Sequence, residues 1–132
     1  WVGEHADVFP PVIAAKARAA AAQAQQMFQR AVKIGVPLAL GTDAAVEPHG
    51  MNAHEFALMA KNGLGAAQVL MAGTANGADL LGIADRTGTL TVGKSADIVA
   101  VPGNALADVH ATEHPLFVMK EGTIYVGGPA GR

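Results

Sequence analysis

The residues best suited to chemistry gather just after a short apolar run at residues 36–40. Thr42, Asp43, Glu47 and His49 all lie in the polar loop that follows. In barrels and open α/β sheets, catalytic groups lie at the carboxyl ends of parallel strands, where a carboxylate can ligate a metal or transfer a proton. An aspartate after a strand also often caps a turn. Both interpretations of Asp43 stay open on position alone; His49 shares its loop and is a candidate site residue, and Glu47 is typical of a solvated acid.

A second pattern, at residues 88–95, matches the phosphate-binding sequence G-x-x-x-x-G-K-[ST]. Such a loop needs a buried strand before it and a helix after it, so that backbone N–H groups meet the phosphates. Here the preceding residues are polar and broken, and residues 96–101 have the periodicity of a strand. We therefore predict a hairpin turn at Gly93 and Lys94, and nucleotide binding is the weakest of the alternatives.

The histidines offer a third kind of chemistry. His110 and His114, with Glu113 between them, have the i, i+4 spacing of a helical metal pair. Pro115 and the lack of a helical period place them in a loop, where they need not share a face. We predict that they are solvated loop side chains. His54 falls in the first turn of a predicted helix and is expected to be exposed or interfacial.

The elements that must position these residues follow an α/β order. Pro10-Pro11 and apolar residues at three- and four-residue steps predict a helix over residues 12–34, which Gly35 ends. The run at 36–40 predicts a strand buried on both faces of a parallel sheet. Further helices are predicted at residues 52–62, 66–73 and 74–82. Beyond residue 85 the period changes to two, which predicts strands at 87–91, 96–101, 116–119 and 123–126, with a hairpin turn at 120–122.

The composition excludes several classes of protein. The chain has 132 residues, of which 51% are hydrophobic and 15% charged, with a net charge of -2. Disorder and a basic nucleic-acid-binding arm are therefore poor interpretations. No apolar run reaches the roughly 18 residues of a membrane span, so we expect a soluble protein, cytoplasmic or periplasmic, without nucleic-acid or membrane partners. The absence of Cys excludes disulfides and thiolate zinc sites.

Five short motifs occur in order along the chain. They are Gly41-Thr42-Asp43-Ala44, Pro48-His49-Gly50, Asn52-Ala53-His54-Glu55, Ala72-Gly73-Thr74 and the segment from Gly88-Thr89-Leu90 to Ala96-Asp97. Together they resemble the C-terminal part of the amidohydrolase superfamily, close to its Xaa-Pro dipeptidase and imidazolonepropionase-like branch. The resemblance covers nearly the whole chain. It implies that the segment at 88–97 is a pair of β-strands in a small domain, which accounts for the P-loop-like pattern.

The resemblance implies the C-terminal part of a (β/α)8 TIM barrel plus strands of a small β-sandwich domain. Residues 1–83 would be the last β/α units of the barrel, with residues 36–40 as its eighth strand, and residues 84–132 would belong to the sandwich. Asp43 would ligate a divalent metal, usually zinc, in a site that holds one or two ions. It would also take the proton from the metal-bound water that attacks an amide carbonyl. Thr42 and His49 would lie near the substrate.

The chain departs from the family in length, because a (β/α)8 barrel takes about 250 residues. A catalytic zinc needs about three protein ligands, and the family's other ligands have no counterpart here. We therefore expect a C-terminal piece of a dipeptidase-like hydrolase, inactive alone, whose partners are a small amide or dipeptide substrate and the remaining N-terminal part of the barrel. A homo-oligomer is left open. The alternative is a noncatalytic α/β scaffold or interaction module.

Overall fold

The structure, a computed structural model, describes residues 5–44 and 49–128, so Glu47 and Pro48 lie outside the described residues. The chain divides into two units. The first comprises Trp1–Val36 with Asp43–Asn52, and the second comprises Pro37–Thr42 with Ala53–Arg132. Among the described residues, no helix is both long enough and apolar enough to span a membrane.

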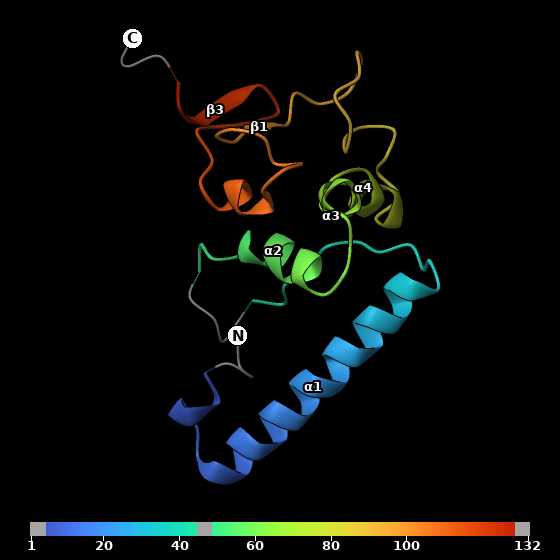
Figure 1. The fold of residues 1–132 in the computed structure, drawn as a ribbon. Coiled ribbons are helices and arrows are strands. Elements are labelled where there is room, and N and C mark those ends of the chain that lie inside the picture. The colour runs from blue at the N-terminus through green and yellow to red at the C-terminus, as the bar shows by residue number, and fades with distance from the viewer. Residues whose placement is uncertain (1–4, 45–48, 129–132) are drawn as a thin grey trace. The chain divides into compact units, whose positions relative to one another are not determined.

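The first unit contains the long helix α1, Pro11–Lys33, which confirms the helix predicted from the apolar period (Figure 1). Pro10 precedes its first turn. The N–H groups at the start of a helix have no acceptor within the helix, so the missing N–H of a proline costs no hydrogen bond there. Gly35, at φ 74°, follows its last turn in the left-handed conformation that glycine adopts without strain. A short 3₁₀ helix, η1 (Ala6–Val8), is tied to α1 by the ion pair between Asp7 and Arg18.

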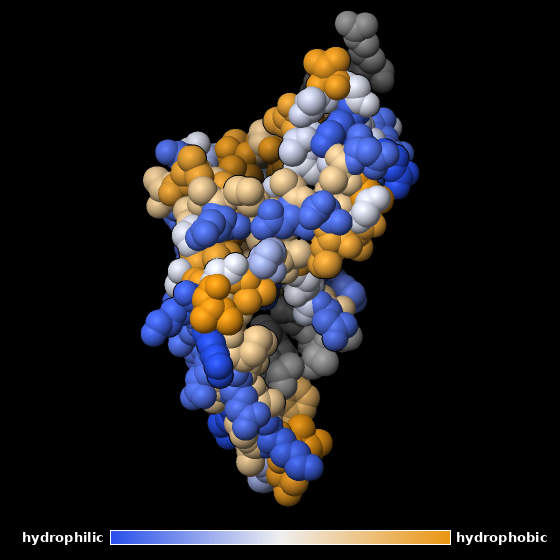
Figure 2. Space-filling model, turned by 90° about the vertical axis from the view of Figure 1, so that its right-hand side faces the viewer, coloured by the Kyte–Doolittle hydropathy of each residue, from blue (hydrophilic) through white to orange (hydrophobic). Residues whose placement is uncertain are grey.

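Within its own unit, the apolar side of α1 is largely uncovered. Ala14 is its only residue described as buried. Val12, Met27 and the following Ile34 are 70%, 64% and 68% exposed. Orange areas in Figure 2 show that other apolar side chains also reach the surface on the face of the molecule drawn there. A helix with such a stripe gains stability only when another surface covers it.

The second unit begins with the segment Pro37–Thr42, which has no regular secondary structure, whereas the sequence predicts a buried strand at 36–40. Among the described residues no strand is present there, Val36 is 45% exposed, and Leu38 and Leu40 are half-buried, so the described part of the chain does not form this strand by itself. A strand requires a ladder of hydrogen bonds to a neighbouring strand. Here Leu40 N–H donates to Ala72 O (2.9 Å), and Leu38 O accepts from Asn76 Nδ2 (2.9 Å), so both bonds lead to helical segments.

Three short helices follow, at the places that the sequence predicts: α2, His54–Lys61; α3, Ala66–Ala72; and α4, Ala75–Leu80. Buried Met59, Leu64 and Val69 supply the larger apolar side chains of their core. The packing is close at Gly73, where an added Cβ would lie 2.5 Å from the ring of Phe56 in α2. Thr74 takes the predicted N-cap position of α4, but its hydroxyl donates to Leu70 O (2.7 Å).

The C-terminal part of this unit holds a three-stranded antiparallel sheet in the order β1-β2-β3. The strands are β1, Ile98–Ala100; β2, Phe117–Lys120; and β3, Thr123–Val126. Glu121 and Gly122 join β2 to β3 with φ values of 49° and 80°. Two positive φ values are typical of the type I′ hairpin turn, so the predicted turn at Gly122 is confirmed.

The prediction of a strand at residues 87–91 is wrong. Turns and bends replace it, with Gly88 and Gly93 at φ 89° and 94°. The turn expected near Gly93 is present, but it does not join two strands of a hairpin. Lys94 Nζ donates to Ala84 O (2.5 Å) and to Thr87 O (3.4 Å), so the lysine of the P-loop-like pattern holds its own loop together. The next regular element is strand β1, not the helix that phosphate binding requires.

Asp97 connects this loop to the hairpin. Its Oδ1 accepts from the backbone N–H of Glu121 (2.8 Å), and its Oδ2 accepts from Thr87 Oγ1 (2.8 Å). These two hydrogen bonds, the first being the stronger cause, hold the pKa of Asp97 below its ordinary value of 3.8, and Lys120 acts in the same direction. Asp97 thus stabilises the fold as a carboxylate.

We expect Asp97→Asn to lower the free energy of unfolding at neutral pH and to weaken its acid dependence. A group whose folded pKa is depressed contributes fully above the unfolded value, here 3.8, and loses the contribution as the pH falls through the folded value. Urea unfolding at a series of pH values from about 7 to about 2 measures this. Asp79→Asn, at an exposed position of α4, is the matched control. A variant with the wild-type pH slope would contradict the role of Asp97.

Candidate metal centre

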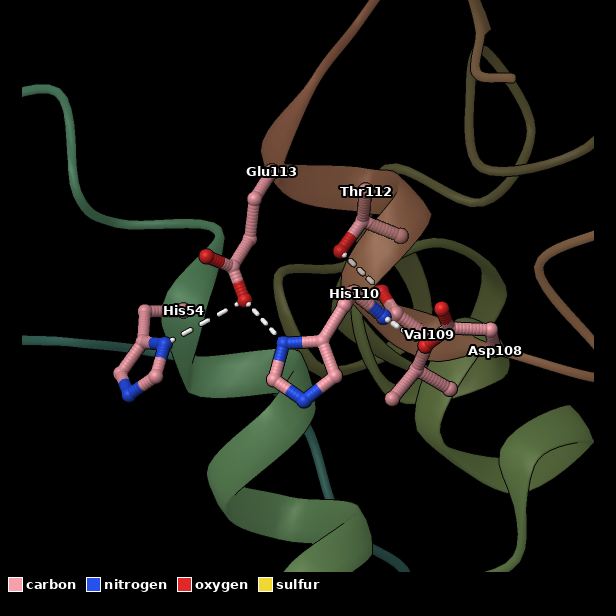
Figure 3. A network of polar contacts seen from close by, with 6 residues as sticks. All are labelled: His54, Asp108, Val109, His110, Thr112 and Glu113. Atoms are coloured by element: carbon pink, nitrogen blue, oxygen red, sulfur yellow. Dashed lines mark hydrogen bonds and ion pairs between the residues drawn. The ribbon is translucent and has the colours of Figure 1, made fainter. Parts of the chain in front are cut away.

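Two histidines and a glutamate from distant parts of the second unit meet at one point (Figure 3). His54 is the first residue of α2, whereas His110 and Glu113 belong to a 3₁₀ helix, η2 (Val109–Glu113). Glu113 Oε1 lies 2.7 Å from His110 Nδ1 and 3.3 Å from His54 Nδ1. One carboxylate oxygen therefore bridges both imidazoles.

Local hydrogen bonds fix the position of η2. Asp108, at its N-cap, accepts from the backbone N–H of His110 through Oδ1 (3.0 Å). Thr112 Oγ1 donates to Val109 O (2.7 Å), and Val109 itself is buried. In a 3₁₀ helix, side chains three positions apart lie one above the other. His110 and Glu113 are therefore held on the same side, facing the start of α2.

The cluster is partly shielded from solvent and contains a carboxylate. The side chains of Glu113, His54 and His110 are 26%, 39% and 61% exposed. The hydrogen bond from His110, with a smaller contribution from His54, holds the pKa of Glu113 below its ordinary value. Glu113 is thus a carboxylate at neutral pH, placed between two rings whose centroids are 6.4 Å apart.

These three side chains have the composition of a metal site. Each offers one ligand atom, and the three atoms lie within 4.8 Å of one another. Two imidazole nitrogens and one carboxylate oxygen are ligands that zinc and neighbouring transition metals accept. The arrangement can bind such a cation, or it can act as an ion-paired link between α2 and η2.

Sequence reasoning missed this cluster. Residues 109–113 form a helix and not the predicted solvated loop, and Glu113 bridges both histidines. The i, i+3 spacing of His110 and Glu113 is the usable signal for this cluster, whereas the i, i+4 spacing of His110 and His114 is not. His114 is exposed, as predicted, and does not belong to the group. No local pattern connects His54 to η2, since 56 positions separate it from His110.

The candidate site residues that follow the apolar run, Thr42, Asp43 and His49, do not belong to this cluster. Asp43 is exposed and adopts φ 48°, a left-handed conformation that aspartate tolerates better than most residues. Such a conformation suits a turn and is also common at functional sites. His49 is exposed in a turn of the same unit, and Thr42 is half-buried at the end of the segment Pro37–Thr42 of the other. The site roles of all three stay predictions.

Comparison with known proteins gives a consistent family. The model of the Amidohydrolase family matches residues 8–125. Ochratoxinase from Aspergillus niger is 35% identical over 125 residues, and 5-methylthioadenosine/S-adenosylhomocysteine deaminase from Desulforudis audaxviator is 42% identical over 80 residues. The crystal structure of a Xaa-Pro dipeptidase with methionine bound in its active site superposes with a TM-score of 0.89 at 37% identity.

These matches cover most of this chain but a minor part of each relative. The ochratoxinase alignment covers 89% of the chain and 26% of the enzyme, and the dipeptidase superposition covers 96% and 32%. The deaminase alignment covers 53% of the chain and 19% of the deaminase. The chain thus spans about a quarter of the length of the ochratoxinase and about a third of that of the dipeptidase.

Proposed function

The chain belongs to the amidohydrolase family, and on that premise we propose that the protein containing it is a metal-dependent hydrolase of C–N bonds in small amides or dipeptides. The observation that carries this proposal is the superposition of 96% of the chain on a Xaa-Pro dipeptidase. The ochratoxinase match supports a hydrolytic activity from sequence alone. A Xaa-Pro dipeptide is the substrate class that the structural match favours.

The proposed architecture is a (β/α)8 barrel in which residues 1–83 supply the last β/α units and residues 84–132 part of a small β-sandwich. Two features of the structure support it. The segment Pro37–Thr42 forms no ladder with another described strand. The exposed apolar residues of α1 also need a covering surface. The remaining part of the barrel would pair with the segment Pro37–Thr42 and would cover the apolar residues of α1.

Asp43 is the proposed catalytic residue and metal ligand. It follows the segment Pro37–Thr42 closely, as a residue at the carboxyl end of the eighth barrel strand would. One carboxylate is too few to hold a zinc ion, which takes about three protein ligands, so the other ligands must come from the rest of the barrel. A divalent metal bound there would lower the pKa of a water molecule toward about 7.

This chain's own contribution would be proton transfer and substrate placement. The Asp43 carboxylate would accept a proton from the attacking water and pass it to the leaving nitrogen, which requires it to be ionised when the substrate binds. Thr42 and His49, on either side of Asp43 in sequence, would bind the substrate. His49 is exposed and therefore accessible to one.

Two other functions are compatible with part of the evidence. The deaminase match at 42% identity favours hydrolysis of an amine on a nucleoside, which also breaks a C–N bond. A noncatalytic α/β scaffold or interaction module would keep the fold without a metal at Asp43. The experiment that tests the proposal must therefore separate dipeptides, other small amides and aminopurine nucleosides as substrates.

We expect the complete polypeptide that carries this chain to hydrolyse Xaa-Pro dipeptides, to lose that activity on prolonged chelation, and to regain it when zinc is added back. Release of free amino acid measures peptide hydrolysis, and release of ammonia measures deamination. A preference for the nucleosides would replace the dipeptidase proposal by the deaminase one. A well-folded protein without activity on any of the three classes would favour the scaffold.

A further inference from the structure

The cluster of His54, His110 and Glu113 has no part in the proposed hydrolysis, which depends on Asp43. All three residues belong to one unit of the chain, so their geometry is independent of how the two units are placed. We propose that this cluster is a divalent transition-metal site, best suited to zinc, in which the metal ties the start of α2 to η2.

The donor set supports a metal of the zinc group. Two imidazoles with one carboxylate suit zinc, cobalt, nickel or copper, whereas calcium and magnesium prefer oxygen ligands alone. The Glu113 carboxylate would balance part of the charge of the ion. Three protein ligands would leave one tetrahedral position for a water molecule.

The distances support the same conclusion. Tetrahedral bonds of about 2.1 Å place neighbouring ligand atoms about 3.4 Å apart. The 3.3 Å between His54 Nδ1 and Glu113 Oε1 already matches this spacing. The 2.7 Å between His110 Nδ1 and the same oxygen must lengthen. The side chain of His110 is 61% exposed, so its ring can move by this amount without disturbing the core.

The polypeptide chain gives such a metal a structural role. His54 and His110 lie in helical segments that are far apart in sequence, and an ion bound by both would close the intervening loop. A ligand that binds the folded state and not the unfolded state raises stability by mass action. Zinc should therefore raise the midpoint of thermal unfolding, and the effect should require all three side chains.

The test titrates Zn²⁺ into the complete polypeptide. The parent protein carries Asp43→Ala, which weakens the binding of the proposed catalytic ion. It is compared with three proteins that carry in addition His110→Gln, Glu113→Gln or His114→Gln. We expect His110→Gln and Glu113→Gln each to weaken zinc binding by about tenfold or more and to abolish the shift of the thermal midpoint. His114→Gln, an exposed histidine outside the group, should behave as the parent protein. Equal zinc stoichiometry, affinity and midpoint in all four proteins would overturn the proposal.

A second measurement needs no substitution in the cluster, so its result remains valid even if one of the variants misfolds. Diethyl pyrocarbonate modifies accessible imidazoles, and ligation to a metal blocks the reaction. Zinc should slow the modification of His54 and His110 in the protein with an intact cluster, and it should leave His114 as reactive as before. Equal rates at His54 and His110 with and without zinc would mean that the cluster is only an ion-paired link between α2 and η2.

Discussion

Asp43→Asn is expected to lower kcat/KM for amide hydrolysis by about 10³-fold or more in the complete polypeptide. The substitution removes the charge that would ligate the metal and accept the proton from water, while it keeps the size of the side chain. Asparagine also tolerates the left-handed conformation that Asp43 adopts at φ 48°. Loss of activity would therefore report the carboxylate and not the backbone of the turn.

The measurement combines steady-state kinetics with the zinc content per polypeptide. Asp85→Asn, an exposed aspartate of the later loop, is the matched control and should keep wild-type kinetics. Unchanged hydrolysis in the Asp43→Asn variant would show that Asp43 only caps a turn, which is the alternative that its position in the sequence leaves open. The zinc titration of the His54 cluster would be unaffected by that outcome.

Gly88→Ala is expected to lower the free energy of unfolding by about 3 kcal/mol or more. Gly88 has φ 89°, a conformation that side chains with a Cβ rarely adopt. An added Cβ would also lie 2.5 Å from the Cβ of Ala78 and 3.2 Å from Thr74 O, both in or beside α4. Because the atoms in the way are the Cβ of an alanine and the backbone, a rotamer change of a neighbour cannot relieve the contact. Urea unfolding of the complete polypeptide measures the loss.

Gly82→Ala separates the two causes of that loss. Gly82 also has a positive φ, 67°, but an added Cβ would meet nothing within 4 Å. It should cost about 1 kcal/mol, the conformational strain alone. The difference between the two variants then reports how closely the loop that begins at Gly88 packs against α4. Equal losses would mean that the loop is not held against α4 in solution.

Some of these features follow from residues close together in sequence. Helix α1 was predictable because Pro10 and Pro11, the apolar period and Gly35 all act within a few residues of the helix that they define. The turn between β2 and β3 was predictable for the same reason, since Gly122 alone favours positive φ. The flanking residues of the P-loop-like pattern predicted β-structure rather than a helix after it, and the element that follows is strand β1.

The sequence-based expectations and the structure differ where partners distant in sequence decide the outcome. The apolar run at 36–40 reads as a strand, but a strand exists only when a neighbour supplies hydrogen bonds along its length. In the described structure its backbone bonds to Ala72 and Asn76 instead. Residues 87–91 alternate as a strand would, yet Lys94 and Asp97 bind the loop into turns.

By itself the sequence determined the helices, the hairpin, the resemblance to amidohydrolases and the candidacy of Asp43, because these depend on local periodicity and short motifs. Only the tertiary structure decided that His54 meets His110 and Glu113. The physical reason is that the pairing depends on how α2 packs against η2, and packing depends on the shapes of side chains that sequence spacing does not encode.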